Sequence, residues 1–324
     1  MKLKICWPES RDGTCPGAIA TLSTHLGVGW NKRKAGADCG QPRFARFWAG
    51  SNNGNANPDC LMTTASELSV VEYFARLASS YGAGEYYRKR RAAALTEIER
   101  RLGKIESLLD LGCGNGTYLS GFREAIDPKF LVGADLSFRM AQEASRRRVT
   151  SAIVVADATL LPFRSTSFRA IFCSHVLQFV ADLARCVAEI SRCLAPAGTF
   201  IIAGGEFGVG ERLKTLLGEV RWGALRAELP RPRNARTRHS LGDYQNAAQR
   251  AGLSVEPQGV DFTVSCADLA EFYRVRWLPL CDSGAQVTLA GVLDELVSER
   301  GSESFQMNES LLFCQQSRPT VTSS

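Results

Sequence analysis

The sequence predicts a doubly wound α/β fold, in which the strands of a mostly parallel sheet alternate with helices on both faces. Five short, nearly continuous apolar runs have the composition of strands that are covered on both faces, and two more strand-like runs follow them. Helical patterns separate the first five runs, and strands that alternate with helices imply a parallel sheet with right-handed crossovers. The runs lie at residues 105–111, 130–134, 152–156, 170–174, 199–203, 253–264 and 310–315.

The chain before the first strand divides into two parts. Residues 1–64 show no sustained apolar periodicity and are rich in Gly, Asn, Pro and Cys, so we expect an irregular or disordered extension there. Residues 65–104 are expected to form two helices, because Val70, Phe74 and Leu77 recur at helical spacing and a stretch dense in Arg and Lys follows.

Residues 105–318 carry the alternating pattern, with two insertions. The clearest helical pattern, at residues 181–195, has apolar residues separated by four, three and four positions. Residues 207–239 interrupt the alternation after the fifth strand, and residues 266–305 form a helical insertion before the last strand. Residues 319–324 are expected to be a tail.

The bulk composition excludes several classes of protein. A formal net charge of +6 over 324 residues permits an acidic ligand but is too small to require nucleic acid as a partner. No apolar run approaches the ~20 residues that span a bilayer, and the N-terminus lacks the apolar core of a signal peptide. The 11 cysteines include no Cys-x-x-Cys pair. We therefore expect a cytoplasmic, metal-free protein with reduced thiols.

Three glycines between the first strand and the next helix are the most informative feature. Gly112, Gly114 and Gly116 let a ligand approach the bare backbone, and the helix N-terminus presents unpaired N–H groups there. Asp135 and Asp157 stand at the ends of the next two strands, which favours a cofactor that carries a nucleoside. The spacing is not the Gly-x-Gly-x-x-Gly of dinucleotide-binding folds, which disfavours a dehydrogenase.

Residues 105–205 resemble the class I S-adenosylmethionine-dependent methyltransferases, in particular the small-molecule and lipid-modifying members. The matching stretches are Leu109-Asp-Leu-Gly-Cys-Gly-Asn-Gly116, Val132-Gly-Ala-Asp-Leu-Ser137, Ala156-Asp-Ala158 with Leu161-Pro-Phe163, Ser174-His-Val-Leu177 and Leu194-Ala-Pro-Ala-Gly198. The resemblance implies a Rossmann-like sheet of seven strands with an antiparallel last strand, S-adenosylmethionine as cofactor, helices of residues 65–104 covering its site, and helical lids at the two insertions.

The resemblance implies roles at the glycine loop and the second strand. The amino-acid portion of the cofactor lies against the loop, where a side chain at Gly112 or Gly114 would collide with it. Asp110 can orient the loop amides or accept a hydrogen bond from the ammonium group. Asp135 can accept hydrogen bonds from both ribose hydroxyls, although a carboxylate that caps the next helix, near Ser137, is the alternative.

The resemblance also implies contacts with the adenine base and with the reacting sulfonium. Asp157, with the Ala158 amide, suits the adenine edge. Leu136 and Met140 would supply apolar cover for the base, and Ser174 would line the site near the sulfonium.

His175 is the candidate catalytic residue, because an imidazole titrates near neutral pH. A pocket wall is the alternative for this side chain. On the N-terminal helices, Tyr87 and Arg88 are candidates for the cofactor carboxylate, and a solvated basic helix face is the alternative.

The acceptor lid is expected in the two insertions. Its candidate residues are Arg221, Trp222, Tyr273 and Trp277. The arginines of the first insertion suit a phosphate or carboxylate on the acceptor, and a solvated loop is the alternative.

The residues and the resemblance together predict an enzyme of the EC 2.1.1 class. It would move a methyl group to an O, N or C atom of a small-molecule acceptor in secondary or cofactor metabolism. A methyltransferase that acts on RNA or protein is the alternative, but Ser174-His-Val-Leu177 stands where base-methylating enzymes carry an Asn-Pro-Pro-Tyr-type tetrapeptide. A non-catalytic relative that binds only the cofactor is the second alternative.

Overall fold

The computed structural model describes residues 4–6, 45–46, 69–204, 208–228 and 239–316. Most of the segment expected to be irregular, residues 1–64, lies outside the described residues, as does the tail at 319–324. The two described pieces of the segment 1–64 are short strands, β1 (Lys4–Cys6) and β2 (Ala45–Arg46).

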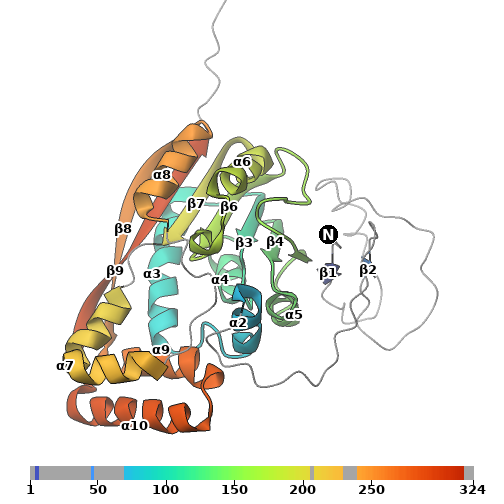
Figure 1. Ribbon diagram of the computed structural model, residues 1–324. Coiled ribbons are helices and arrows are strands. Elements are labelled where there is room, and N and C mark those ends of the chain that lie inside the picture. Colours follow the sequence, from blue (N-terminus) through green and yellow to red (C-terminus); the bar gives the residue numbers. More distant parts are fainter. Residues whose placement is uncertain (1–3, 7–44, 47–68, 205–207, 229–238, 317–324) are drawn as a thin grey trace, which may run out of the picture.

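The predicted doubly wound sheet is confirmed (Figure 1). Its described strands run in the order β2-β1-β5-β4-β3-β6-β7-β9-β8. The five strands from β5 to β7 in this order are parallel, whereas the last strand in sequence, β9, is antiparallel to both neighbours. The described strands other than β1 and β2 are β3 (Ser107–Leu111), β4 (Phe130–Asp135), β5 (Ala152–Val155), β6 (Phe168–Ser174), β7 (Leu194–Gly204), β8 (Leu253–Ser265) and β9 (Ser304–Gln316).

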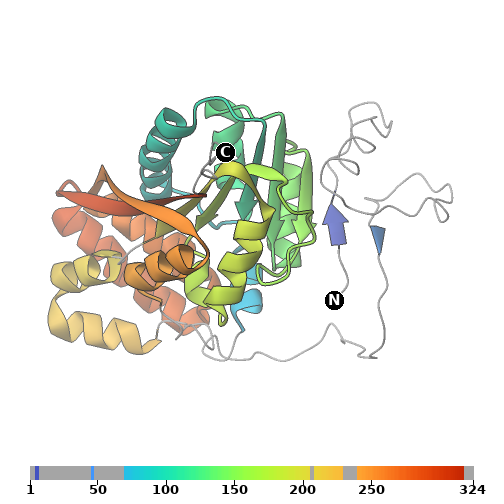
Figure 2. The ribbon, with the colours of Figure 1, turned by 90° about the horizontal axis from the view of Figure 1, so that it is seen from above.

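Helices cover both faces of the sheet (Figure 2). On one face, Leu109 and its neighbours pack against α6 (Leu183–Cys193) and α8 (Leu241–Arg250). On the other face, Leu108 belongs to a core shared with three further helices. These are α3 (Glu85–Leu102), α4 (Thr117–Ala125) and α5 (Phe138–Arg146). The central strand β3 is buried on both faces, as its continuous apolar run predicts.

A helical layer lies beyond the β8–β9 end of the sheet. It contains α7 (Gly208–Glu228), α9 (Cys266–Trp277), α10 (Ser283–Arg300) and the short 3-10 helix η4 (Leu278–Leu280). Their apolar faces share one core with side chains of α3 and with the ends of β8 and β9. The two sequence insertions therefore supply these helices, as expected.

The N-terminal helix α2 (Val70–Leu77) packs against α5 and η4. Ser69 and Glu72 form a capping box at its start, which satisfies backbone donors that a helix leaves free. Behind α2, the Asn115 side chain of the glycine loop donates hydrogen bonds to the carbonyl oxygens of Ala78 (3.0 Å) and Tyr81 (2.7 Å). These bonds tie the segment after α2 to the loop.

Candidate active site

The glycines of the loop have positive φ angles, and the neighbour that excludes a side chain at Gly112 is a residue of this chain. Gly112 has φ +74°, and a Cβ there would lie 2.1 Å from Val176 Cγ2. A Cβ at Gly114, where φ is +55°, would lie 3.7 Å from the Tyr81 ring, an ordinary contact. We expected a side chain at Gly112 to collide with the cofactor, but it would already collide with Val176.

Asp135 joins the loop to the turn after β4. Its Oδ2 accepts a hydrogen bond from the Gly114 amide (2.9 Å), and its Oδ1 accepts one from the Ser137 amide (2.8 Å). Burial raises the pKa of Asp135 to about 6, although both amides favour the ionised form. A carboxylate has about four acceptor positions, so two remain for further donors.

Asp110 lies beneath the loop at the end of β3 and is 1% exposed. Its Oδ2 has no hydrogen-bond partner in the described structure. Burial, together with the charge of Asp135, holds the pKa of Asp110 well above its ordinary value. A buried oxygen without a partner is costly, so this atom suits a donor from a ligand.

The structure describes the other residues expected near the adenine base. Asp157 Oδ1 accepts hydrogen bonds from the amide and the hydroxyl of Thr159, each at 2.8 Å. Leu136 is 51% exposed, whereas Met140 is 1% exposed and packs with the buried residues of α2. Ala158 packs against the core on the α6 side of the sheet.

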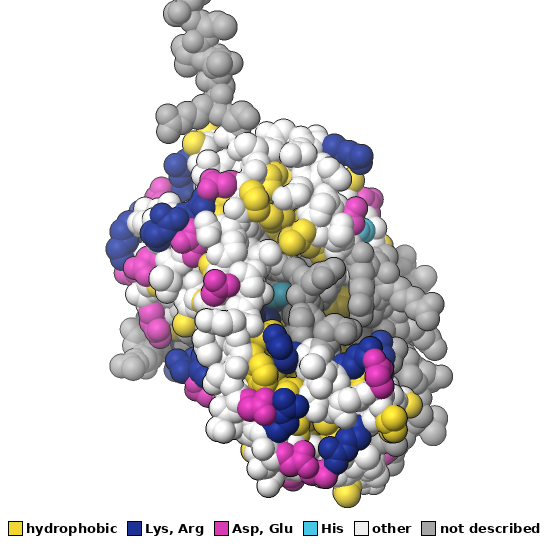
Figure 3. All heavy atoms as spheres, turned by 90° about the vertical axis from the view of Figure 1, so that its left-hand side faces the viewer, with side chains coloured by type: hydrophobic (Ala, Val, Ile, Leu, Met, Phe, Trp, Pro, Cys, Tyr) yellow, Lys and Arg dark blue, Asp and Glu magenta, His cyan; other side chains and the backbone are white. Residues whose placement is uncertain are grey.

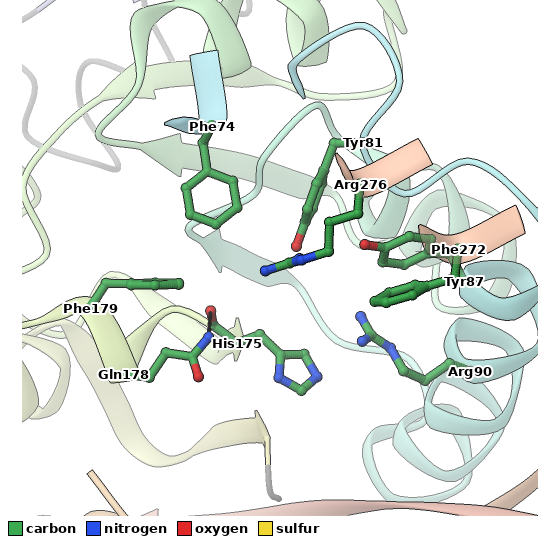
Figure 4. Close-up of a pocket in the computed structure, with 9 residues that line it drawn as sticks. All are labelled: Phe74, Tyr81, Tyr87, Arg90, His175, Gln178, Phe179, Phe272 and Arg276. Atoms are coloured by element: carbon green, nitrogen blue, oxygen red, sulfur yellow. Dashed lines mark hydrogen bonds between the residues drawn. The ribbon is translucent and has the colours of Figure 1, made fainter. Parts of the chain in front are cut away.

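A pocket opens directly beside the glycine loop (Figure 4). Tyr81, whose ring faces Gly114, forms one wall. His175 forms another and directly precedes Val176, which faces Gly112. The lining residues come from α2, the turn between α2 and α3, α3 itself, α9, the residue after β6 and the 3-10 helix η3 (Leu177–Phe179). They are Phe74, Tyr81, Tyr87, Arg90, His175, Gln178, Phe179, Phe272 and Arg276.

His175 is held between β6 and β9. Its backbone has φ +54°, and its amide donates to Ala203 O (2.9 Å). Its Nε2 lies 2.6 Å from Glu309 Oε1 on β9, and the two side chains are 9% and 3% exposed. Burial and the nearby Arg90 charge lower the pKa of His175, so the ring is neutral at pH 7.

Glu309 remains ionised in spite of its burial. Burial alone would raise the pKa of its carboxyl, but the Arg90 charge and the hydrogen bond with His175 outweigh this effect and lower it. A neutral imidazole beside a carboxylate donates through the nitrogen that faces it. Nε2 of His175 is therefore the donor, and Nδ1 is the nitrogen that can take up a proton.

Arg90 and Arg276 are the cations of the pocket. Arg90 on α3 is 7% exposed, and its Nε lies 3.7 Å from Glu309 Oε1. The Arg276 guanidinium lies 5.9 Å from the centre of the Tyr73 ring and 6.0 Å from that of Phe272.

The four expected lid residues lie elsewhere in the helical layer. Arg221 forms an ion pair with Glu295 (2.6 Å) on α10. Trp222 is 8% exposed and Tyr273 is 1% exposed, both within the core of that layer. Trp277 stacks on Tyr273 with ring centres 4.3 Å apart. The described pocket is lined instead by their neighbours on α9, and the arginines of residues 229–238 lie outside the described structure.

Of the two candidates on α3, only one lines the pocket. Tyr87 is 4% exposed and lines the pocket, whereas Arg88 points outward and pairs with Glu85 (2.5 Å). Sequence reasoning missed Arg90, although it lies one helical turn after Tyr87 and therefore on the same face. It also missed Glu309, for which the sequence offers no signal.

The described residues contain neither a membrane-spanning helix nor a candidate metal site. None of the helices there is both long enough and apolar enough to cross a membrane. No group of three or more His, Cys, Asp or Glu side chains in that part of the chain could hold a metal ion.

Comparison with known proteins identifies the core. Residues 109–202 match the family model described as "Methyltransferase domain". The chain is 37% identical over 113 residues to a demethylmenaquinone methyltransferase of Beutenbergia cavernae, covering 35% of this chain and 45% of that protein. It is 31% identical over 147 residues to a malonyl-[acyl-carrier protein] O-methyltransferase of Serratia marcescens, covering 43% and 54% respectively. The chain thus spans about half the length of these relatives.

Solved structures are similar at lower identity. The YcgJ protein from Bacillus subtilis has a TM-score of 0.47 and 18% identity, covering 69% of this chain and 98% of that one. Phosphoethanolamine N-methyltransferase 2 of Haemonchus contortus, solved with S-adenosylmethionine, has a TM-score of 0.43 and 17% identity, covering 69% and 52%. Residues 109–202 of this chain thus match a methyltransferase domain, and they include most of the parallel strands of the sheet.

Proposed function

We propose that this protein transfers a methyl group from S-adenosylmethionine to an O, N or C atom of a small molecule bound in the pocket beside the glycine loop. The observation that carries the proposal is the shared wall between loop and pocket. Tyr81 faces Gly114 and also lines the pocket, and Val176 faces Gly112 next to the pocket residue His175. A cofactor on the loop and an acceptor in the pocket would therefore be neighbours.

The residues of the loop fit the cofactor. Asp135 keeps two acceptor positions for ribose hydroxyls after it has bound the Gly114 and Ser137 amides. Asp110 offers a buried oxygen without a partner. When bound, the cofactor would supply a methyl group already activated by the sulfonium charge. Positioning of the acceptor could then provide effective molarities on the order of 10⁵ M or more.

His175 is proposed as the base where the acceptor must lose a proton. The Glu309 carboxylate fixes the ring by accepting from Nε2–H (2.6 Å), so Nδ1 is the atom that takes up the proton. Glu309 thus acts as a positioning residue. Burial keeps the imidazole neutral and able to accept at pH 7.

Small acceptors are supported by two observations. The names of the two relatives above give demethylmenaquinone and malonyl-[acyl-carrier protein], the latter a small acyl group carried on a protein, as what those proteins methylate. On the face shown in Figure 3, acidic and basic side chains of the described residues are interspersed, which gives no continuous basic surface for RNA. Salt-sensitive RNA binding by the full-length chain would favour the alternative acceptor.

Binding and turnover test the proposal. We expect S-adenosylhomocysteine to bind the full-length protein in isothermal titration calorimetry, and Asp135→Ala to weaken this binding by about 10-fold to 100-fold because hydrogen bonds to a charged group are lost. Asp294→Ala is the control, because Asp294 is an exposed carboxylate on α10. An unchanged affinity for S-adenosylhomocysteine in Asp135→Ala would contradict the cofactor assignment. A screen of acceptors with labelled cofactor would test turnover.

A further inference from the structure

The pocket contains a cation that no carboxylate of the described residues neutralises. Arg276 extends from α9 past Tyr81 toward the middle of the pocket (Figure 4). After burial itself, the groups that most affect the pKa of Arg276 in the described structure are three phenols, those of Tyr73, Tyr87 and Tyr81. In contrast, Arg274, two residues earlier on α9, forms an ion pair with Asp294.

The other charges of the pocket balance. Arg90 faces Glu309, with Nε and Oε1 3.7 Å apart. His175 is neutral because burial and Arg90 lower its pKa. Burial raises the pKa of Tyr87 and of Tyr73, so both phenols keep their protons. One positive charge, that of Arg276, is left over.

Aromatic rings form the walls around this charge. The Phe74 ring packs edge-on against Tyr81 at 5.6 Å and against Phe179 at 5.3 Å. Phe272 forms the wall next to Tyr87, with ring centres 5.1 Å apart. A guanidinium that no carboxylate of the described residues neutralises, placed among aromatic rings, complements a ligand with a flat or apolar body and one negative group.

We propose that Arg276 is the specificity-determining residue of this enzyme, and that the acceptor is a small organic acid with an apolar body whose carboxylate Arg276 binds. The inference rests on the proposed function for the methyl transfer, but the carboxylate site itself does not depend on it. A planar guanidinium matches a carboxylate through two parallel hydrogen bonds. The carboxylate removes the charge imbalance, and the aromatic walls hold the body beside the glycine loop.

The test measures binding of defined acids and their neutral counterparts. Saturation-transfer NMR with the full-length protein compares benzoate, phenylacetate and cinnamate with the matching amides, in the presence and absence of S-adenosylhomocysteine. We expect the acids to bind with dissociation constants of about 10 mM or lower, and the amides to bind at least tenfold more weakly. Equal binding of acid and amide, or no binding of any acid in that range, would overturn the proposal.

Variants assign the effect to Arg276. We expect Arg276→Gln to weaken acid binding by about 10-fold to 100-fold, because a charge-assisted hydrogen bond is lost. Arg276→Lys keeps the charge but not the planar guanidinium, so its affinity for the acids should lie between those of the wild type and of Arg276→Gln. The matched control is Arg274→Gln, on the same helix but in a surface ion pair. Circular dichroism and the melting temperature check that each variant is folded.

A second arm separates the acceptor from the cofactor, which also carries a carboxylate. We expect Arg276→Gln to leave the affinity for S-adenosylhomocysteine within about twofold of wild type, since the bound carboxylate belongs to the acceptor. Loss of S-adenosylhomocysteine binding in Arg276→Gln, with acid binding intact, would overturn the inference. Failure of the wild-type protein to bind S-adenosylhomocysteine would instead contradict the proposed function and leave the acid-binding result to decide the inference.

Discussion

Gly112→Ala should destabilise the protein through two separate effects. The backbone at this position has φ +74°, and a new Cβ would lie 2.1 Å from Val176 Cγ2. The left-handed conformation costs a residue with a Cβ about 1–2 kcal/mol. Forcing an extra carbon into a packed site costs a further 1–3 kcal/mol or so. We therefore expect the free energy of unfolding to fall by about 2–5 kcal/mol in total.

A control and a double mutant separate the two effects in urea unfolding. Gly252 has φ +79° and nothing within 4 Å of its Cβ position, so Gly252→Ala should cost only the conformational part, about 1–2 kcal/mol. In the Val176→Ala background the atom closest to the new Cβ becomes Val176 Cβ, at 3.0 Å. Gly112→Ala should then cost at least about 1 kcal/mol less than in wild type.

Two results would contradict the role given to the contact between Gly112 and Val176. A cost for Gly112→Ala that is no larger than that for Gly252→Ala would show that the contact with Val176 does not constrain the loop. Additive costs for Gly112→Ala and Val176→Ala would show the same.

Three further predictions concern the site. Burial raises the pKa of Asp135 to about 6 from an ordinary value of 3.8, so ionisation of this carboxyl lowers the stability of the fold as the pH rises from about 4 to 6. Binding of S-adenosylhomocysteine needs the carboxylate, so the affinity measured by calorimetry should fall below pH 6. An affinity that does not change between pH 7.5 and 5 would contradict this. Glu309→Gln should reduce kcat with little change in KM for acceptors that must lose a proton, because His175 loses the carboxylate that fixes its tautomer, and unchanged kcat across the pH profile would contradict the positioning role. Asn115→Ala should accelerate amide hydrogen exchange at residues 78–84, since two side-chain hydrogen bonds to the segment after α2 are lost; protection equal to wild type would show that other contacts hold this segment.

The sheet could be predicted from the sequence because its buried strands are continuous apolar runs. The ends of the strands were harder to predict from the sequence. β7 begins at Leu194, five residues before the predicted start, because Leu194 pairs with Phe168 across a register shift. β9 begins at Ser304 rather than at 310, since its first half alternates polar and apolar residues and gives a weaker signal than a covered strand.

The cofactor side of the site was visible in the sequence, whereas the acceptor side was not. The glycines and Asp135 lie within one continuous stretch of strand, loop and helix, so their spacing alone brings them together. The pocket combines residues of α2, α3, η3 and α9 that are far apart in the sequence. Arg90 stands between Lys89 and Arg91 in a basic helix, and its one local signal is its position one turn after Tyr87 on the same face.

A crystal structure of the protein with S-adenosylhomocysteine would show where the sulfur of the ligand points. We expect the ligand to lie on the glycine loop, its ribose to contact Asp135, and its sulfur to face the pocket that contains His175 and Arg276. A sulfur that opens onto any other surface, or a ribose that does not contact Asp135, would contradict the claim that this pocket receives the methyl acceptor.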